Sequence, residues 1–278
     1  MKDKQLSILE FGRLLLEAKD LDPVYDLIWH SGWKGEKLHK WLLSYWCFYH
    51  VGTASWIVDQ KKYWPAMEIA AGSKDYPRSS ERRHFRGDNA KEAVAYLKSI
   101  GIDSLFKPLL SSKCKTVEDV FKIVKPWVGF GPWISFKIAD MLDRLSLNSI
   151  SFTEADIFLF DSPAEAAEIL WREEYGVITS GIPLVEAYGK DRKNLIQNWA
   201  MDYIKRNLED HLAPPRFERP IDNQEAETIL CKWKSYLSGH YEIGWDVQHC
   251  RTGLAKFPDT VSSQELVQAG IKAELWDE

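Results

Sequence analysis

The sequence predicts an all-α protein, because apolar residues recur at helical spacing along nearly its whole length. The pattern is clearest near the middle of the chain, where a Gly-x-Gly-Pro turn at residues 129–132 separates two amphipathic helical stretches. Residues 149–160 form the one segment whose pattern fits extended structure. With 278 residues, 45% of them hydrophobic, the chain can build one large helical domain or two small ones.

Start and stop signals place the predicted helices in order. Pro23 opens the second helix, and Gly101 ends the helix that follows the first long polar segment. Gly52 is expected to bend a long aromatic helix, because glycine weakens helix interiors. The expected helices cover residues 6–19, 22–29, 36–58, 62–71, 88–99, 116–125, 132–146, 163–174, 191–209, 223–238 and 262–275. Loops are expected at 72–88 and 176–189, and a proline-rich interior boundary at 211–222.

The turn at 129–132 has the chemistry of an anion site. Pro126 ends the first helix, and Pro132 suits the first turn of the second. Gly129 and Gly131 allow positive φ in a very tight connection and let a phosphate approach the main chain closely. Free N–H groups at the start of a helix can bind such an anion. A plain glycine turn between two helices is the simpler interpretation.

Charge is distributed unevenly along the chain. The formal net charge of −5 does not favour a protein that coats DNA nonspecifically. However, residues 74–137 hold thirteen Lys and Arg against seven Asp and Glu, so this stretch carries +6 and the remainder −11. A positive middle on an acidic chain fits a localised phosphate-binding face, although chance clustering on a solvated surface gives the same pattern.

The segment from residue 78 to residue 87 concentrates the positive charge. Four arginines and one histidine would form a strong anion site if they converged, because a guanidinium binds phosphate through a bidentate fork. The next helix would add positive potential at its N-terminus. The alternative is a solvated charge run. The candidate residues are Arg78, Arg82, Arg83, His84 and Arg86.

The turn resembles the helix-hairpin-helix of the DNA glycosylase superfamily, whose usual sequence is Leu-Pro-Gly-Val-Gly-Pro. Both glycines and the proline match, whereas Trp127 and Val128 replace the usual Leu-Pro. Lyase members carry a lysine two places after the second glycine, where this chain has Trp133. The resemblance therefore implies a DNA-binding hairpin at 116–146 without Schiff-base chemistry.

A narrower resemblance joins three segments. Glu-Arg-Arg-His-Phe-Arg-Gly at 81–87, the hairpin, and Leu-Cys-Lys-Trp-Lys at 230–234 resemble the α-glutamyl/putrescinyl thymine pyrophosphorylase family of phages, also described as amino acid:DNA transferases. The resemblance spans roughly residues 30–260. It implies that an amine from an amino acid or polyamine displaces (pyro)phosphate from a phosphorylated 5-hydroxymethyluracil in DNA, and that a kinase supplies this substrate.

The resemblance also assigns roles to residues. A base in duplex DNA is best reached by extruding its nucleotide into a pocket. The arginine segment would stabilise the departing (pyro)phosphate, and His84 could protonate its leaving oxygen, unless that histidine is merely structural. Glycosylases carry an aspartate some twenty residues after the hairpin, which loosely matches Glu154 or Asp156, the latter preferred as the carboxylate base. The simpler interpretation is that Asp156 caps a turn.

Further residues are expected near DNA or solvent. Phe130 and Trp133, with Trp127, are expected to stack on DNA, although core packing carries equal weight. Asp140 and Asp143 on the second hairpin helix are expected to face solvent. The full set of expected DNA contacts is Gly129, Phe130, Gly131, Trp133 and Lys137.

The cysteines and the chain start bear on compartment and cofactors. Four cysteines without paired spacing suit a reducing cytoplasm, in the host cell if the chain is phage-encoded. No zinc site is expected, because the spacing of Cys231, His240, His249 and Cys250 fits no common one. No apolar run reaches the length of a membrane span, and the start lacks the apolar stretch of a secretion signal. No cofactor is expected to be required, beyond a cation that the hairpin could hold.

The combined prediction is an all-α, helix-hairpin-helix, glycosylase-like enzyme with a cleft between two helical lobes. Residues 1–278 would form a single catalytic unit, in which the terminal helices, 1–58 and 223–278, could share one lobe. Its partners would be double-stranded DNA and an amino acid or polyamine donor, with no membrane. A monofunctional glycosylase that uses Asp156 and a noncatalytic DNA-binding module are the alternatives.

Overall fold

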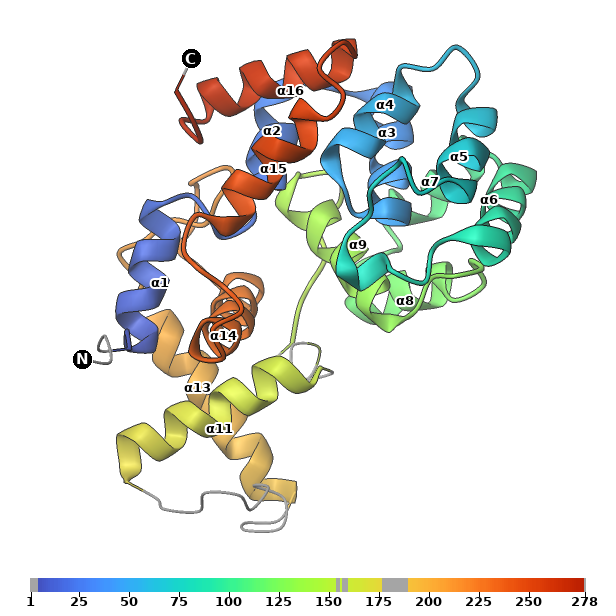
Figure 1. Ribbon diagram of the computed structural model, residues 1–278. Coiled ribbons are helices and arrows are strands. Elements are labelled where there is room, and N and C mark those ends of the chain that lie inside the picture. Colours follow the sequence, from blue (N-terminus) through green and yellow to red (C-terminus); the bar gives the residue numbers. More distant parts are fainter. Residues whose placement is uncertain (1–4, 154–155, 157–159, 177–189, 278) are drawn as a thin grey trace. The chain divides into compact units, whose positions relative to one another are not determined.

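The computed structural model describes residues 5–153, 156, 160–176 and 190–277, and within these residues the protein is all-α (Figure 1). The only β-type pairings there are two isolated bridges, Thr116 with Ser151 and Leu212 with Pro220. The predicted fold class is therefore confirmed, and within the described part of the predicted extended segment 149–160 one residue, Ser151, forms a β-bridge. None of the described helices is long and apolar enough to cross a membrane.

The chain divides into two compact units, each assembled from separate stretches of sequence. Unit 1 comprises Met1–Leu21 and Phe152–Trp245, and unit 2 comprises Asp22–Ser151 and Asp246–Glu278. The proline-rich segment 211–222 lies inside unit 1. The predicted hairpin and arginine segment both lie inside unit 2.

Unit 1 is built around helix α14, which packs against three other helices of the unit. Its fully buried Trp233 donates an indole hydrogen bond to the carbonyl of Leu6, 3.1 Å away, just ahead of α1. The first and last parts of this unit are thereby joined, as the blue and red-brown ribbons of α1 and α14 show (Figure 1). The helices are α1 Ile8–Glu17, α11 Asp161–Tyr175, α13 Lys190–Asn207 and α14 Asn223–Leu237.

Unit 2 contains most of the aromatic core, including the fully buried Trp41, Trp46 and Phe106. Its helices pack as successive pairs, α3 with α4, α5 with α6 and α8 with α9, while α16 returns to cover α2 and α4. The helices are α2 Pro23–Ser31, α3 Gly35–Phe48, α4 Val51–Val58, α5 Tyr63–Gly72, α6 Gly87–Ile100, α7 Ile102–Leu109, α8 Val117–Val124, α9 Pro132–Arg144, α15 Trp245–Ala255, which begins at the unit boundary, and α16 Val261–Lys272, with a short 3₁₀ turn η1 at Ser80–Arg82.

The predicted helix 36–58 breaks three residues before the glycine expected to bend it. Tyr49 adopts a left-handed backbone conformation (φ 50°) at the end of α3, and the His50 side chain caps α4 by accepting from the Thr53 N–H at 3.1 Å. Gly52 has a different role, since an added Cβ there would lie 1.9 Å from the carbonyl oxygen of Gly253. This glycine permits the close approach of another backbone, which the sequence alone cannot reveal.

Two helices of the structure, α7 and α15, are absent from the prediction. Helix α7 follows α6 directly, because Gly101 ends α6 and also caps the start of α7, whereas the sequence predicts only the helix end there. Helix α15 is only weakly amphipathic, so the apolar spacing that marks a helix is faint there. The loop predicted at 176–189 lies outside the described residues except for Gly176, which ends α11 in a left-handed conformation (φ 62°).

Candidate functional site

The two hairpin helices form as their sequence patterns predict. Thr116 caps α8 by accepting from the Asp119 N–H, while the Asp119 carboxylate accepts from the Thr116 N–H in return. Helix α8 then packs directly against α9, as their neighbouring green ribbons show (Figure 1). The two helices of the predicted hairpin are therefore present within unit 2 and pack as neighbours.

The two glycines of the turn have different roles. Gly129 has φ +79°, a conformation that side chains disfavour. Gly131 is extended and caps α9, and a Cβ added to it would meet nothing within 4 Å. Positive φ, expected at both positions, is therefore found only at Gly129. Gly131 is exposed, and its lack of a side chain leaves the main chain open to a ligand.

The start of α9 presents main-chain donors beside this exposed glycine. The first helical hydrogen bond runs from the Ser135 N–H to the Gly131 carbonyl at 3.1 Å, so the N–H groups of Trp133 and Ile134 precede the helical ladder. Pro132 has no N–H to offer. The start of α9 thus leaves these two N–H groups outside the helical hydrogen-bond ladder, and anion binding by them stays a prediction.

The aromatic residues of the hairpin are mostly committed to the core. Trp127 and Phe130 are only 5% and 7% exposed, and their rings pack edge to face at 5.3 Å. Trp133 keeps exposed surface while its ring packs against Tyr49 at 4.9 Å. Of the three rings expected to face DNA, Trp133 is thus the one available for stacking, and the contact predicted for Phe130 could come only from its backbone.

Arg82 joins the arginine segment to the hairpin. Its side chain is buried, and its guanidinium donates to the carbonyl of Cys47 at 3.0 Å and to that of Gly129 at 2.9 Å. The same group lies over the rings of Phe85 and Phe130, at 4.8 Å and 5.0 Å. The structure therefore brings together two segments that the sequence analysis singled out separately.

Arg78 is used internally in a similar way. One of its terminal nitrogens donates to the carbonyls of Ala70, Ser73 and Tyr76 at 3.2, 3.0 and 3.3 Å, and the other donates to the carbonyl of Phe85. Burial lowers the pKa of the Arg78 guanidinium. Arg78 and Arg82 thus brace the loop.

The outward-facing cations of the segment are Arg83, His84 and Arg86, all exposed. Arg83 makes one local bond, to the Ser80 carbonyl at 3.2 Å. Arg86 stands at the N-cap of α6, so its charge adds to the positive end of that helix. Two of the four predicted arginines thus remain available for an anionic ligand.

Asp140 contradicts the expectation that it faces solvent. Its side chain is 1% exposed on α9, and its Oδ2 accepts a 2.7 Å hydrogen bond from the buried Tyr25 hydroxyl. Lys137 Nζ lies 3.9 Å from the same oxygen. Oδ1 has no hydrogen-bond partner among the described residues. Burial raises the pKa of the Asp140 carboxyl to about 7, against the opposing effects of Arg144 and Lys137.

Asp140 belongs to a stripe along α9 that becomes more buried toward the C-terminal end of the helix and that sequence reasoning missed. Trp133, Lys137, Asp140 and Arg144 follow one another at helical spacing along α9. The Arg144 guanidinium pairs with Asp22 at 2.5 Å and covers the Tyr25 ring at 4.5 Å. The sequence did contain a signal for this burial. Apolar residues occur around most of the circumference of α9, and such a helix is usually buried, including its charged residues.

The carboxylates predicted after the hairpin lie in unit 1. Glu154 falls outside the described residues. Asp156 accepts hydrogen bonds from both the N–H and the hydroxyl of Thr153 at 2.9 Å. It therefore caps a local turn, and its role as a base stays a prediction.

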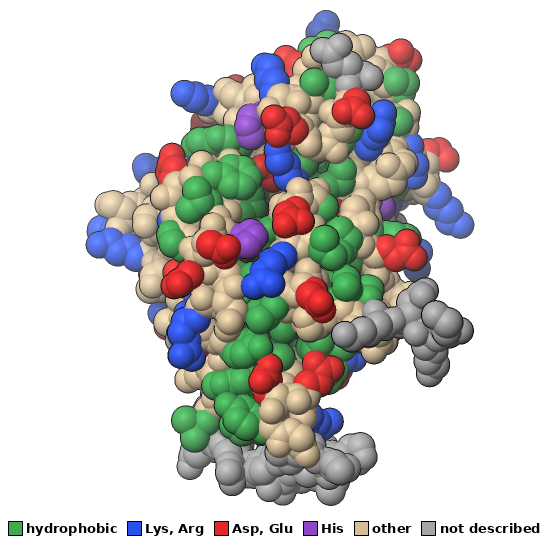
Figure 2. All heavy atoms as spheres, turned by 90° about the vertical axis from the view of Figure 1, so that its left-hand side faces the viewer, with side chains coloured by type: hydrophobic (Ala, Val, Ile, Leu, Met, Phe, Trp, Pro, Cys, Tyr) green, Lys and Arg blue, Asp and Glu red, His purple; other side chains and the backbone are tan. Residues whose placement is uncertain are grey.

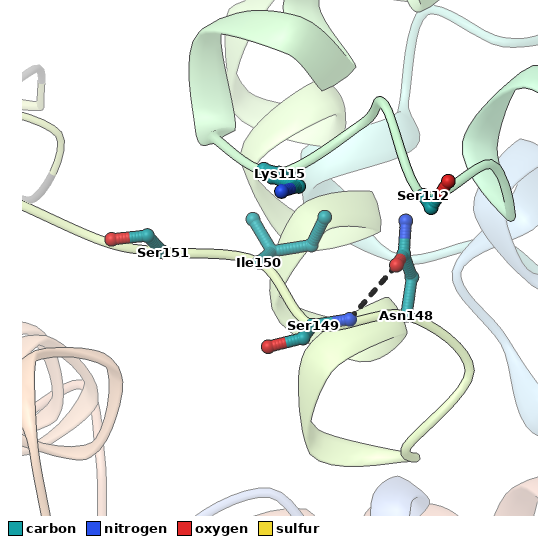
Figure 3. Close-up of a pocket in the computed structure, with 6 residues that line it drawn as sticks. All are labelled: Ser112, Lys115, Asn148, Ser149, Ile150 and Ser151. Atoms are coloured by element: carbon teal, nitrogen blue, oxygen red, sulfur yellow. Dashed lines mark hydrogen bonds between the residues drawn. The ribbon is translucent and has the colours of Figure 1, made fainter.

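A hollow of about 480 Å³ lies at the base of the hairpin, between the segment before α8 and the segment after α9 (Figure 3). Its lining residues are Ser112, Lys115, Asn148, Ser149, Ile150 and Ser151. The Asn148 amide donates to the carbonyls of Leu109 and Cys114, at 2.7 and 2.8 Å, and its oxygen accepts from the Ser149 N–H. The hollow is thus held in shape by Asn148 and lined by hydroxyl groups and one lysine.

Charged side chains of both signs alternate on the described part of the face in Figure 2, among exposed hydrophobic groups. The basic stretch 74–137 lies within unit 2. Among the described residues, no group of three or more His, Cys, Asp and Glu could hold a metal ion.

Sequence comparisons identify relatives over nearly the whole chain. The sequence profile of the amino acid:DNA transferase family matches residues 16–242. A glycinyltransferase of Pseudomonas phage PaMx11 is 34% identical over 264 residues, which cover 89% of this chain and 90% of the relative. A putrescinyltransferase of Delftia phage PhiW-14 is 26% identical over 262 residues, covering 91% of this chain and 79% of the relative.

Proposed function

The chain belongs to the amino acid:DNA transferase family, and from this membership we propose that it joins the nitrogen of an amine donor to a base in DNA. The observation that carries the proposal is the extent of the family match, because residues 16–242 include the hairpin, the arginine segment and parts of both units. The two phage relatives, a glycinyltransferase and a putrescinyltransferase, point to an amino acid or a polyamine as donor.

The reaction we propose is substitution at a methylene carbon. The substrate base is a uracil whose 5-hydroxymethyl group a kinase has converted to a phosphate or pyrophosphate ester. The donor nitrogen forms a bond to the methylene carbon while the bond from that carbon to the ester oxygen breaks. The leaving group departs with the electron pair, and the new ammonium loses a proton to give the neutral product.

The described geometry supports different roles for different residues of unit 2. The N–H groups at the start of α9 and the exposed Gly131 would hold a DNA phosphate. Arg83 and Arg86, which face outward, would bind the leaving (pyro)phosphate. His84 would protonate the leaving oxygen, and Trp133 would stack on an unpaired base. Arg82 would contribute indirectly, because its hydrogen bond to the Gly129 carbonyl positions the turn.

A transfer assay tests the proposal. Duplex DNA that carries 5-phosphomethyluracil or its pyrophosphate form is incubated with the protein and isotopically labelled glycine, glutamate or putrescine. Mass spectrometry of the digested nucleosides should show an aminomethyl linkage with at least one donor. Free base and abasic sites would instead identify a glycosylase. Retention of the phosphorylated base with every donor would contradict the proposal.

Salt dependence of DNA binding tests the role of the arginines. Each phosphate contact contributes about 0.9 to the slope of log K against log salt concentration on duplex DNA. Arg83→Gln and Arg86→Gln should each reduce that slope by about this amount if both contact phosphates. Arg251→Gln, an exposed arginine of unit 2 outside the basic stretch, is the matched control and should leave the slope unchanged.

A further inference from the structure

One face of α9 runs from the exposed hairpin turn into a buried carboxylate. Gly131 and Pro132 are exposed, Trp133 is half-buried, the Lys137 side chain is 12% exposed and Asp140 is 1% exposed. Trp133 and Asp140 are seven residues apart, which corresponds to about 10 Å along the helix. The same helix, α9, thus carries at its start the surface proposed to contact DNA and, further along, the buried carboxyl of Asp140.

The Asp140 carboxylate is incompletely satisfied where it lies. Tyr25 holds Oδ2, but Oδ1 has no hydrogen-bond partner among the described residues, and the Lys137 ammonium is 3.9 Å from Oδ2, beyond a hydrogen bond. A buried polar atom left without a partner is costly, and in a native protein it needs an explanation. A hydrogen-bond donor that arrives with a ligand is one such explanation.

The groups around Asp140 are aromatic or charged. Tyr25 donates its hydroxyl hydrogen bond to Asp140. The Tyr49 ring packs on Trp133. Burial raises the pKa of the Tyr49 hydroxyl, and the charges of Lys137, Asp22 and Asp140 also affect it. Tyr49 also holds a left-handed backbone conformation (φ 50°), which non-glycine residues adopt at an energetic cost and which recurs at functional sites. Carboxylates and aromatic rings together are the chemistry that recognises ammonium groups.

We propose that Asp140, with Tyr25, Tyr49 and Trp133 around it, binds the ammonium group of the amine donor and takes the proton that this group must lose before it can attack. The inference rests on the proposed function and names the base of that reaction. The positive Lys137 and Arg144 beside it lower the pKa of Asp140 and so favour its ionised form, against the larger effect of burial.

The step balances as follows. The ammonium donates a hydrogen bond to Oδ1 of Asp140 and then transfers that proton to it, leaving a neutral amine. The amine attacks the methylene carbon as described above, and Asp140 returns its proton to water after the product leaves. The elevated pKa of Asp140, about 7, suits a base that must act near neutral pH.

Asp156, the base expected from the sequence, has a different environment. Its Oδ2 already accepts two hydrogen bonds from Thr153. Replacing it should loosen a turn of unit 1 without changing the proton transfer. Asp156→Asn is therefore the natural competitor to Asp140→Asn in the same assay.

The experiment compares two amines that differ in whether they need a base. Glycine is protonated at neutral pH, whereas methoxyamine is already unprotonated there. Single-turnover transfer to phosphorylated DNA is measured for wild type, Asp140→Asn and Asp156→Asn, with Glu118→Gln on the exposed surface of α8 as the control. Asp140→Asn should slow transfer from glycine about 100-fold, as expected for loss of a general base, but slow transfer from methoxyamine far less.

Each remaining outcome has a definite meaning. Equal loss with both amines, in a variant that unfolds like wild type, would assign Asp140 a structural role and overturn the inference. A selective glycine defect in Asp156→Asn instead of Asp140→Asn would overturn it as well. A wild-type protein inactive with every amine would contradict the proposed function itself, which is a distinguishable result.

A second variant keeps the inference testable if Asp140→Asn folds poorly. The hydrogen bond from Tyr25 lowers the pKa of Asp140, so Tyr25→Phe should raise that pKa while it keeps the ring. The other charged groups that face Asp140 are Asp22, Lys137 and Arg144, and these are unchanged. In Tyr25→Phe, the pH below which kcat/KM for glycine declines should therefore be higher than in wild type. An unchanged pH would contradict the assignment of Asp140 as the base.

Discussion

Arg82 and Asp140 are both buried charges of unit 2, and their surroundings differ in kind. Arg82 donates to the main-chain carbonyls of Cys47 and Gly129 and is covered by aromatic rings, although its second terminal nitrogen has no hydrogen-bond partner among the described residues. Asp140 is held by side chains, Tyr25 and the more distant Lys137, and keeps one oxygen without a partner among the described residues. An arginine stays protonated throughout the usual pH range, whereas a carboxyl whose pKa is about 7 can exchange its proton there.

This difference suggests a structural role for Arg82 and a role in proton transfer for Asp140. A guanidinium held by carbonyls fixes two segments of backbone relative to each other, and its replacement should affect folding first. A buried carboxyl whose pKa is about 7 can take up and release a proton near neutral pH, and its replacement should affect chemistry first. The comparison makes predictions that can be ranked by size.

The largest expected effect is on stability at Arg82. Arg82→Ala leaves the carbonyls of Cys47 and Gly129 without their buried donor, and we expect it to lower the free energy of unfolding by about 3 kcal/mol. Arg83→Ala, one residue along and exposed, should change it by less than about 0.5 kcal/mol. Urea unfolding monitored by tryptophan fluorescence measures both. Similar losses in the two variants would remove the distinction between bracing and outward arginines.

The second prediction concerns pH. Because burial raises the pKa of Asp140 from 3.8 to about 7, the folded protein binds this proton more tightly than the unfolded chain does. The contribution of Asp140 to the free energy of unfolding should therefore fall as pH rises from about 4 to about 7. Asp140→Asn should flatten that decline in urea unfolding measured across this range. A variant whose pH dependence equals that of wild type would show that Asp140 is ionised normally.

The smallest predicted effect distinguishes the two glycines of the turn. Gly129→Ala must adopt φ +79°, so it should cost about 1 kcal/mol, although its Cβ would meet Phe85 and Ala93 only at an ordinary 3.6 Å. Gly131→Ala fits its extended backbone and open surroundings and should leave thermal unfolding unchanged. If the main chain at Gly131 contacts phosphate, the same Gly131→Ala protein should bind DNA more weakly. Unchanged DNA binding would place the phosphate elsewhere.

Much of the fold follows from local sequence signals. The spacing of Val117, Val120 and Val124 gave α8, and the prolines and glycines around 129–132 gave the turn and the start of α9. The all-α class and the family were likewise identifiable from the sequence. The break at Tyr49 was misplaced, because the close packing of Gly52 on Gly253 brings together residues that are two hundred positions apart.

The site was predictable only in outline. The sequence by itself determined which charged residues the hairpin and the arginine segment carry, since composition and spacing are local properties. Tertiary structure alone decided where those charges point: Arg82 inward to Gly129, Arg83 outward, and Asp140 into the core beneath Tyr25. The physical reason is that burial, and with it the pKa of a carboxyl, depends on distant neighbours that no local pattern of residues records.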